Sequence, residues 1–249
     1  MDTPALNRIH AIPGLYISDQ FSARDPSLLE THRISHILCV TRWEDLLRIG
    51  LTTPQIPGTE PEIQCKHVNL DDDPTEDILR HLGEMLDWVR DALIQPHPRP
   101  HLNSKSNSNS NSTENAESQP NTEHTGGRVL VHCSQGISRS GAVVVAYIMR
   151  SLFIPYADAL ALARVSRRLI TPNVGFEWQL RIWEHCGYEV FDCVVENGSV
   201  VLTRKPTYEE FVDEVGNVFD RLDHEEVLRA KMDWLRTVWS RLRVFRGDG

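Results

Sequence analysis

The chain of 249 residues has few cysteines, and none of them stand at a paired spacing. The five cysteines occupy positions 39, 65, 133, 186 and 193. A disulfide framework or a cysteine zinc site needs cysteines at close, repeated spacings, so this pattern argues against both. The sequence therefore predicts a protein of a reducing compartment, cytoplasmic or nuclear, that uses no metal and no other cofactor.

Long hydrophobic runs and an excess of positive charge are also missing. No apolar run approaches the roughly 18 residues that span a bilayer, and residues 1–4 lack the basic and apolar regions of a signal peptide. The formal net charge of −9 opposes general binding of nucleic acid, which needs a basic face. We therefore expect an intracellular protein with no membrane span and no nucleic-acid partner.

One short polar loop between two apolar runs carries the main chemical signal. It reads His132, Cys133, Ser134, Gln135, Gly136, Ile137, Ser138, Arg139 and Ser140. Apolar residues at 129–131 precede it and apolar residues at 142–149 follow it, which predicts a strand, a tight loop and a buried helix. Backbone N–H groups at the start of a helix bind anions, because the positive end of the helix dipole adds to them.

The side chains of this loop suit a phosphoryl group. The N–H donors would stabilise the thiolate of Cys133, which is the nucleophilic form of cysteine. The planar fork of Arg139 can hold two oxygens of a phosphoryl group above the sulfur. Gly136 allows the chain to bend back on itself.

The loop resembles that of the cysteine-dependent phosphatases of the protein tyrosine phosphatase superfamily: His-Cys, five residues, Arg, then Ser or Thr. The resemblance implies that Cys133 attacks phosphorus, and that Arg139 and the loop residues 134–138 surround the phosphate. Ser140 would stabilise the departing thiolate. His132 would organise the loop, with an ordinary core histidine as the alternative.

A general acid is expected at the end of a second strand, because the leaving oxygen of a phosphoester departs badly unless it receives a proton. Val68 and Leu70 alternate as a half-buried strand, and three aspartates follow. The phosphatase pattern of apolar, any, apolar, any, Asp, with an apolar residue six further on, matches Asp72 and Ile78. We predict Asp72 as the general acid.

The two neighbouring aspartates receive other predictions. Asp71 is one residue out of frame and is kept as an alternative acid. Asp73 is expected to support the turn or to cap a helix predicted over about residues 75–93.

A third segment indicates which group within this superfamily the chain resembles. Residues 166–180 resemble the Arg, apolar, Pro-Asn-x-Gly-Phe, Gln-Leu segment of dual-specificity phosphatases, and residues 12–18 and 33–40 resemble the opening strands of that domain. The resemblance, to the atypical type, covers about residues 9–190. It implies that Asn173 supports the cysteine loop and that Arg168 meets a second phosphate on the substrate. A solvated helix end at Arg167 and Arg168 is the alternative.

Two segments depart from the family pattern. Residues 96–127 are rich in serine and asparagine, cannot bury enough apolar surface, and are predicted to be disordered. Residues 191–249 form a C-terminal extension, predicted as a hairpin around Asn197-Gly198 and two helices that begin near Thr207 and Asp223. This extension lacks the cysteines with which some dual-specificity phosphatases build a zinc module.

The last helix is predicted to be amphipathic and basic. Its apolar stripe comprises Leu228, Met232, Leu235, Trp239 and Leu242. We expect this helix to pack on the preceding helix and the catalytic domain. Contact with a partner or with an anionic membrane surface is the alternative.

The sequence thus predicts an α/β fold with a central mixed, mainly parallel sheet flanked by helices, the cysteine loop at a strand-to-helix turn, and a small α+β C-terminal extension. Residues 1–190 would form the catalytic domain. The expected function is hydrolysis of phosphotyrosine and phosphoserine or phosphothreonine in proteins, through a phosphocysteine. Alternatives are a phosphoinositide or RNA 5′-phosphatase, a phosphoprotein-binding module, and a thiol redox enzyme with Cys39 as the resolving cysteine.

Overall fold

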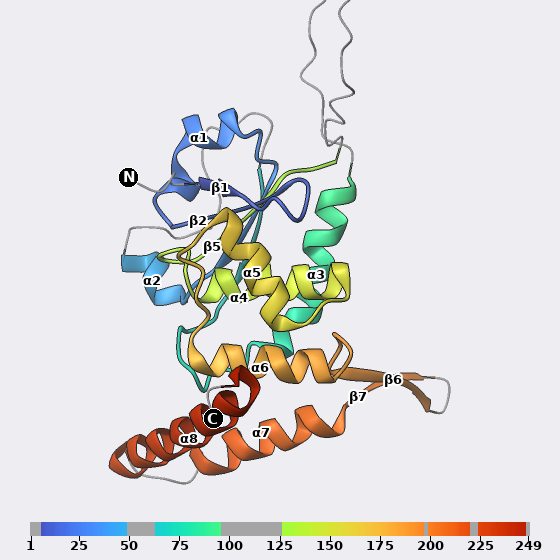
Figure 1. Cartoon of the computed structure of the whole chain (residues 1–249). Coiled ribbons are helices and arrows are strands. Elements are labelled where there is room, and N and C mark those ends of the chain that lie inside the picture. Colours follow the sequence, from blue (N-terminus) through green and yellow to red (C-terminus); the bar gives the residue numbers. More distant parts are fainter. Residues whose placement is uncertain (1–5, 49–62, 96–125, 197–198, 220–223, 248–249) are drawn as a thin grey trace, which may run out of the picture.

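A five-stranded sheet forms the centre of the molecule, in the order β1-β2-β5-β3-β4 (Figure 1). The computed structural model describes residues 6–48, 63–95, 126–196, 199–219 and 224–247. β1 pairs antiparallel with β2, and the other neighbouring strands are parallel, which confirms the mixed, mainly parallel sheet. The strands are β1 (Leu6–Arg8), β2 (Leu15–Ser18), β3 (His36–Val40), β4 (Gln64–Val68) and β5 (Val129–His132).

Helices cover both faces of the sheet. Val129 and Val131 of β5 join the larger core, under the helices on one face, while Leu130 joins a smaller core on the other. Because successive side chains point to opposite faces and both faces are buried, β5 is a continuous apolar run. The larger core contains α3 (Leu79–Ile94), α4 (Arg139–Leu152), α5 (Tyr156–Ser166) and α6 (Val174–His185); the smaller contains the 3₁₀ helix η1 (Ser22–Arg24) and α1 (Pro26–Thr31).

The parallel strands bring their carboxyl ends to one edge of the sheet. His132 at the end of β5 is in register with Ser18 at the end of β2 and with Cys39 near the end of β3. Val40 and Val68 end β3 and β4 side by side. The loops after these strands, including the cysteine loop and the aspartate run, therefore meet at this edge. The short helix α2 (Trp43–Arg48) follows β3 at the same edge.

The helix expected from about residue 75 begins later, at Leu79. The sequence-based start was wrong because the backbone just before α3 is bound by another helix. Gln179 of α6 accepts a hydrogen bond from the Ile78 N–H at 2.9 Å and donates one to the Glu76 carbonyl at 2.8 Å. These contacts keep the backbone before Leu79 out of the helix, with a turn at residues 74 and 75 and a bend at residue 76.

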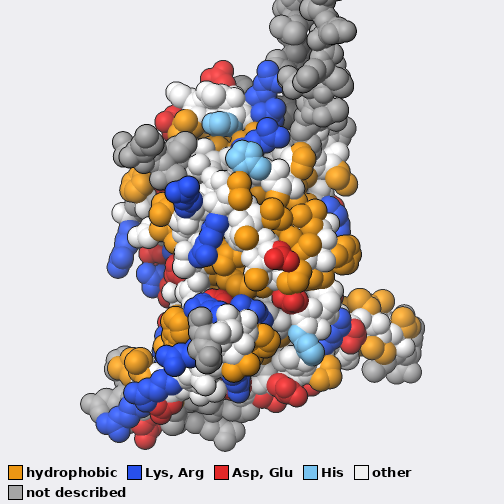
Figure 2. Space-filling model, in the orientation of Figure 1, with side chains coloured by type: hydrophobic (Ala, Val, Ile, Leu, Met, Phe, Trp, Pro, Cys, Tyr) orange, Lys and Arg blue, Asp and Glu red, His pale blue; other side chains and the backbone are white. Residues whose placement is uncertain are grey.

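The C-terminal segment forms a hairpin and two helices, as predicted. β6 (Phe191–Glu196) and β7 (Ser199–Arg204) pair antiparallel, and α7 (Pro206–Phe219) and α8 (His224–Arg246) follow. In Figure 1 the two helices lie beside α6 and the hairpin extends from the body, and Figure 2 shows hydrophobic side chains on that hairpin. Thr207 lies inside the first turn of α7 rather than at its cap, since Pro206 opens the helix.

The predicted apolar stripe of α8 was largely wrong. Trp234, Val238 and Leu242 are buried, and this face packs on α6 and α7. Three members of the predicted stripe are about half exposed, namely Leu228, Met232 and Trp239. The helix carries two overlapping apolar stripes that share Leu242, and the large ring of Trp234 decides which one faces the core. The expected packing on the preceding helix and the rest of the fold is confirmed.

Three further expectations concern residues outside the described ranges. They are the disorder of residues 96–127, the turn at 197–198 and the helix cap at Asp223. Of residues 96–127, the structure describes only 126 and 127. Within the described ranges, no single helix has both the length and the hydropathy to cross a bilayer, and α4 with α5 pass only as a pair bent by 119°.

Candidate active site

The cysteine loop connects β5 to α4 and surrounds the Cys133 sulfur with donors. The backbone N–H of Gly136 and the hydroxyl of Ser140 each lie 3.2 Å from Cys133 Sγ. Cys133 itself is buried. The sulfur at the base of the loop is therefore in contact with two hydrogen-bond donors, one from the backbone and one from a side chain.

The carbonyl groups of the loop point outwards. Four successive carbonyls accept hydrogen bonds from residues outside the loop, namely Ser134 from the Gln20 N–H, Gln135 and Gly136 from the Arg167 guanidinium, and Ile137 from the Thr171 N–H. The C=O and N–H of a trans peptide unit point in opposite directions. The N–H groups of residues 135–138 therefore point to the inside, where they form a cradle for an anion.

Glycine is required at position 136. Its backbone has φ +68°, in the left-handed region that favours glycine. A Cβ at this position would also lie 2.5 Å from the carbonyl oxygen of Ser18, at the end of β2. The loop thus packs directly on the neighbouring strand.

Arg167 is a supporting residue that the sequence did not reveal. Its guanidinium is buried and donates to the Gly136 carbonyl at 3.0 Å, to the Gln135 carbonyl at 3.2 Å and to Asn7 Oδ1 at 2.7 Å. The interpretation of this arginine pair as a solvated helix end is therefore wrong for Arg167. Arg168 is exposed, and no hydrogen bond or ion pair joins it to the cysteine loop among the described residues, so its role stays a prediction.

Arg139 lies at the start of α4 with its guanidinium in the loop. Nη1 donates to the Leu70 carbonyl at 3.1 Å, and Nη2 donates to Ser134 Oγ at 2.9 Å. Nε is buried and has no hydrogen-bond acceptor among the described residues. A buried guanidinium nitrogen without an acceptor is costly, and an oxyanion bound in the cradle would supply one.

Asp72 reaches the same site from the loop after β4. Its Oδ1 accepts hydrogen bonds from Ser138 Oγ at 2.5 Å and from Asn173 Nδ2 at 2.9 Å, and its Oδ2 lies 3.9 Å from Arg139 Nε. Its side chain is 38% exposed, so it can reach a bound substrate. The neighbouring Asp71 instead lies 3.4 Å from Arg42. Of these two aspartates, Asp72 is the one directed at the cysteine loop.

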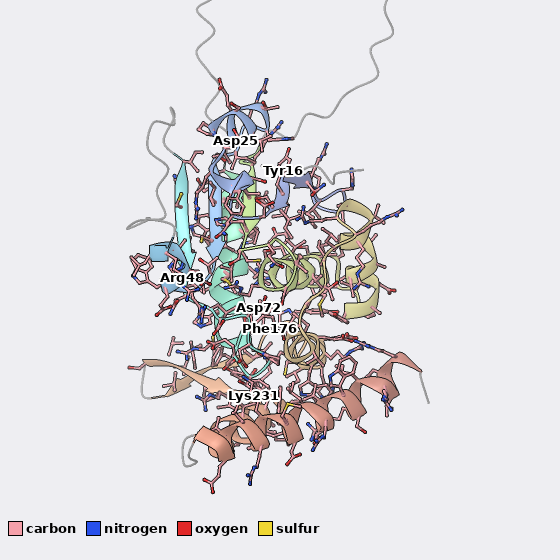
Figure 3. The ribbon with its side chains drawn as sticks, turned by 90° about the vertical axis from the view of Figure 1, so that its left-hand side faces the viewer. Tyr16, Asp25, Arg48, Asp72, Phe176 and Lys231 are labelled. Atoms are coloured by element: carbon pink, nitrogen blue, oxygen red, sulfur yellow. The ribbon has the colours of Figure 1, made fainter. Side chains whose placement is uncertain are left out.

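Asn173 contacts Asp72 with its side chain and the cysteine loop with its backbone. Its side chain holds Asp72 through Nδ2 and caps α6 by accepting the Phe176 N–H at 2.9 Å. Its backbone N–H donates to Ser138 Oγ at 3.0 Å. A single asparagine at the start of α6 therefore links the acid, the cysteine loop and the helix. Figure 3 shows Asp72 and Phe176 close together between the sheet and the C-terminal helices.

His132 is buried at the end of β5. Burial lowers the pKa of His132 to about 4, so the ring is neutral at neutral pH. Its Nδ1 lies 3.4 Å from the Cys133 carbonyl oxygen. A neutral ring that contacts the backbone of the loop fits the predicted organising role better than the role of a base.

Close contact between α6 and the loop that carries Asp72 requires glycine at position 175. A Cβ there would lie 1.7 Å from the carbonyl oxygen of Pro74. Gly175→Ala is therefore expected to lower the free energy of unfolding by about 1–3 kcal/mol, because the loop or the helix must shift. Urea denaturation measures this change.

Gly216→Ala on α7 is the matched control for that experiment. A Cβ at position 216 meets nothing within 4 Å, so this variant should be as stable as the wild type or up to about 1 kcal/mol more stable. Wild-type stability of Gly175→Ala would contradict the close contact.

Comparison with known proteins agrees with this geometry. The family model of the dual specificity phosphatase catalytic domain matches residues 112–186. The chain is 28% identical over 179 residues to human dual specificity protein phosphatase 22, covering 72% of this chain and 73% of that protein. The chain is therefore similar to the dual-specificity phosphatases in both sequence and fold.

Two further proteins match over a similar part of the chain. Identity to dual specificity protein phosphatase MPK-4 of Drosophila melanogaster is 27% over 177 residues, 71% of this chain but 36% of that protein. The crystal structure of human tyrosine phosphatase-like serine/threonine/tyrosine-interacting protein superposes with a TM-score of 0.53 at 26% identity, covering 72% of this chain and 95% of that one. The relatives that are named dual specificity protein phosphatases support phosphoprotein phosphatase activity for this chain.

Proposed function

We propose that this dual-specificity phosphatase hydrolyses phosphotyrosine, together with phosphoserine or phosphothreonine, in protein substrates. The observation that carries the proposal is the cradle formed by the N–H groups of residues 135–138, which point inwards beside the Cys133 sulfur. Phosphoryl transfer depends mainly on positioning and on stabilisation of negative charge. The cradle and the Arg139 guanidinium supply both.

The reaction follows from these positions in two steps. The Cys133 thiolate attacks phosphorus in line, the phosphorus–oxygen bond to the leaving group breaks, and Asp72 gives its proton to the leaving oxygen. In the second step, Asp72 takes a proton from water, which attacks the phosphocysteine and releases phosphate and the thiolate. Ser140, which donates to Cys133 Sγ, stabilises the thiolate as it departs.

Replacement of the acid tests the proposal together with its assignment to Asp72. Asp72→Asn should lower kcat/KM, which reports the steps up to formation of the phosphocysteine, by about 10²-fold to 10⁴-fold on a phosphotyrosine peptide, because the phenolate of tyrosine needs a proton as it leaves. The loss should be smaller on 4-nitrophenyl phosphate, whose leaving group is already stable as an anion. Phosphate release from both substrates, and from a phosphothreonine peptide, measures these effects.

Asp71→Asn is the control, because Asp71 pairs with Arg42 rather than with the cysteine loop. This variant should keep kcat/KM near the wild-type value. The reverse pattern, with Asp71 essential and Asp72 dispensable, would move the acid to Asp71. No turnover by the wild type on any of the three substrates would count against the proposed function.

Two other functions have weaker support. A phosphoinositide or RNA phosphatase would be favoured by basic loop residues, whereas Ser134, Gln135 and Ile137 are neutral. A phosphoprotein-binding module is supported by the similarity of the fold to human tyrosine phosphatase-like serine/threonine/tyrosine-interacting protein, because that name describes an interaction. The presence of Cys133, Arg139 and Asp72 in this chain supports catalysis instead.

Thiol redox chemistry with Cys39 is also disfavoured. Burial raises the pKa of Cys39 to about 11, with a smaller opposing effect from its hydrogen bond with Thr41. Cys39 is therefore a thiol at neutral pH, and a thiol is a poor resolving nucleophile.

Three finer expectations from the sequence remain proposals. One is an intracellular location, cytoplasmic or nuclear. Another is contact of α8 with a partner or an anionic membrane surface, supported by the exposed Leu228, Met232 and Trp239 on a helix that also carries exposed arginines. The last is the division into a catalytic domain at 1–190 and an extension at 191–249.

A further inference from the structure

The C-terminal helices are built into the core next to the active site. Trp234, Val238 and Leu242 of α8 belong to the same buried cluster as Phe176 and Trp183 of α6. At the far end of α8, Arg246 pairs with the buried carboxylate of Glu177 on α6. Burial of such side chains fixes the position of α8 against α6 along its length.

At its other end, α8 contacts the loop that carries the general acid. Lys231 pairs with Oδ2 of Asp73, the residue directly after Asp72. Oδ1 of Asp73 accepts hydrogen bonds from the N–H of Thr75 at 2.9 Å and from its hydroxyl at 2.7 Å. Burial alone would raise the pKa of Asp73, but the hydrogen bonds from Lys231 and Thr75 outweigh burial and lower it. The carboxylate thus ties the turn to α8.

A second contact comes from α7. The hydroxyl of Tyr208 donates to Oδ2 of Asp77 at 2.7 Å, and Oδ1 of Asp77 accepts the Arg80 N–H at 3.2 Å in the first turn of α3. Tyr208 is buried beside Phe191 and Phe211. Burial raises the pKa of Tyr208, so the phenol keeps its proton and acts as a donor. The loop of residues 69–78 between β4 and α3 carries Asp72 and is called the acid loop below. Its end nearer to α3 is therefore bound to α7.

The acid loop is thus held on two sides. On one side α6 provides Gln179 and the close contact at Gly175. On the other, Lys231 and Tyr208 bind carboxylates at the two ends of the segment 73–77. In Figure 3, Asp72, Phe176 and Lys231 follow one another from the sheet towards the C-terminal helices.

We propose that α7 and α8 position the general acid, with Lys231 and Tyr208 as positioning residues for Asp72. This inference rests on the proposed phosphatase function. A displacement of a catalytic group by about 1 Å can cost about 10²-fold in rate. Neither residue touches the reacting atoms, so their loss should act through Asp72 alone.

Substrates with different leaving groups separate this role from a general loss of structure. Lys231→Gln should lower kcat/KM on phenyl phosphate on the order of tenfold, because departure of the phenolate, which precedes the hydrolysis step common to all substrates, depends on a well-placed acid. The rate on 4-nitrophenyl phosphate should change much less. Tyr208→Phe, which keeps the buried ring, should act in the same direction, and Lys231→Arg should restore part of the rate.

Arg236→Gln is the matched control on the same helix, because Arg236 forms an exposed ion pair with Asp233. It should leave both rates near wild type. In an Asp72→Asn background, Lys231→Gln should cause no further loss, since the acid on which it acts is gone.

The outcomes separate the two proposals. A wild type without phosphatase activity overturns the proposed function. An active wild type that needs Asp72, but whose Lys231→Gln and Tyr208→Phe variants keep wild-type rates on both substrates, overturns the positioning role. Equal losses on both substrates, or a full further loss in the Asp72→Asn background, also overturn it.

Discussion

Cys133→Ser should reduce kcat by about 10⁴-fold to 10⁶-fold on every phosphorylated substrate. A serine hydroxyl would retain its proton, because the loop holds donors rather than a base. Gly136 and Ser140 both donate towards position 133, and the neighbouring His132 ring is directed at the backbone. Initial rates of phosphate release, measured in reductant and chelator, give the size of the loss.

The inactive variant should still bind phosphopeptides, because the inward N–H groups and Arg139 do not depend on the sulfur. Isothermal titration with a phosphotyrosine peptide therefore distinguishes loss of the nucleophile from loss of the fold. Cys193→Ser is the control, since Cys193 is exposed on β6 and should be replaceable without effect on the rate. Substantial turnover by Cys133→Ser would exclude the phosphocysteine.

Arg139→Lys is expected to lower kcat/KM by about 10³-fold although the charge is kept. The guanidinium contacts the Leu70 carbonyl with Nη1 and Ser134 Oγ with Nη2, which aligns its plane. A lysine side chain has one nitrogen. It cannot replace the two guanidinium nitrogens that make these contacts and also bind two phosphate oxygens. Inhibition by inorganic phosphate should weaken in parallel, because the same donors bind the product.

Arg90→Lys serves as the control for this substitution. Arg90 pairs with Asp87 and Asp91 on the exposed side of α3, so its replacement should leave kcat/KM and inhibition by phosphate unchanged. If Arg139→Lys kept kcat/KM within about threefold of wild type, bidentate binding of the phosphoryl group by Arg139 would be wrong.

Local sequence was a good guide wherever neighbouring residues decide the outcome. The cysteine loop, the apolar strand before it and the buried helix after it are contiguous, so the order of residues 129–149 predicted the order of the elements. The hairpin and the two C-terminal helices followed in the same way from turn residues and helical periodicity. The start of α3 failed, because Gln179, about a hundred residues away, binds the backbone at Glu76 and Ile78.

Contacts between distant residues also explain the remaining errors. Arg167 and Arg168 are adjacent arginines in the sequence, and only the fold directs the first into a buried site with acceptors from the cysteine loop. The stripe of α8 was misjudged because helical periodicity offers two overlapping faces. The face that carries Trp234 and Val238 is buried against other helices, whereas Met232 and Trp239 on the other face are exposed.

The sequence by itself determined the strand-to-helix turn that carries Cys133 and Arg139, because the residues of this turn lie within one continuous stretch. The spacing also favoured Asp72 over Asp71 as the general acid, whereas only the tertiary structure decided which side chains contact each aspartate. Asp72 meets Ser138 and Asn173, whereas Asp73 meets Lys231, a partner 158 positions away in the chain. Partners so far apart are brought together by the burial of the helices that carry them, which no local pattern encodes.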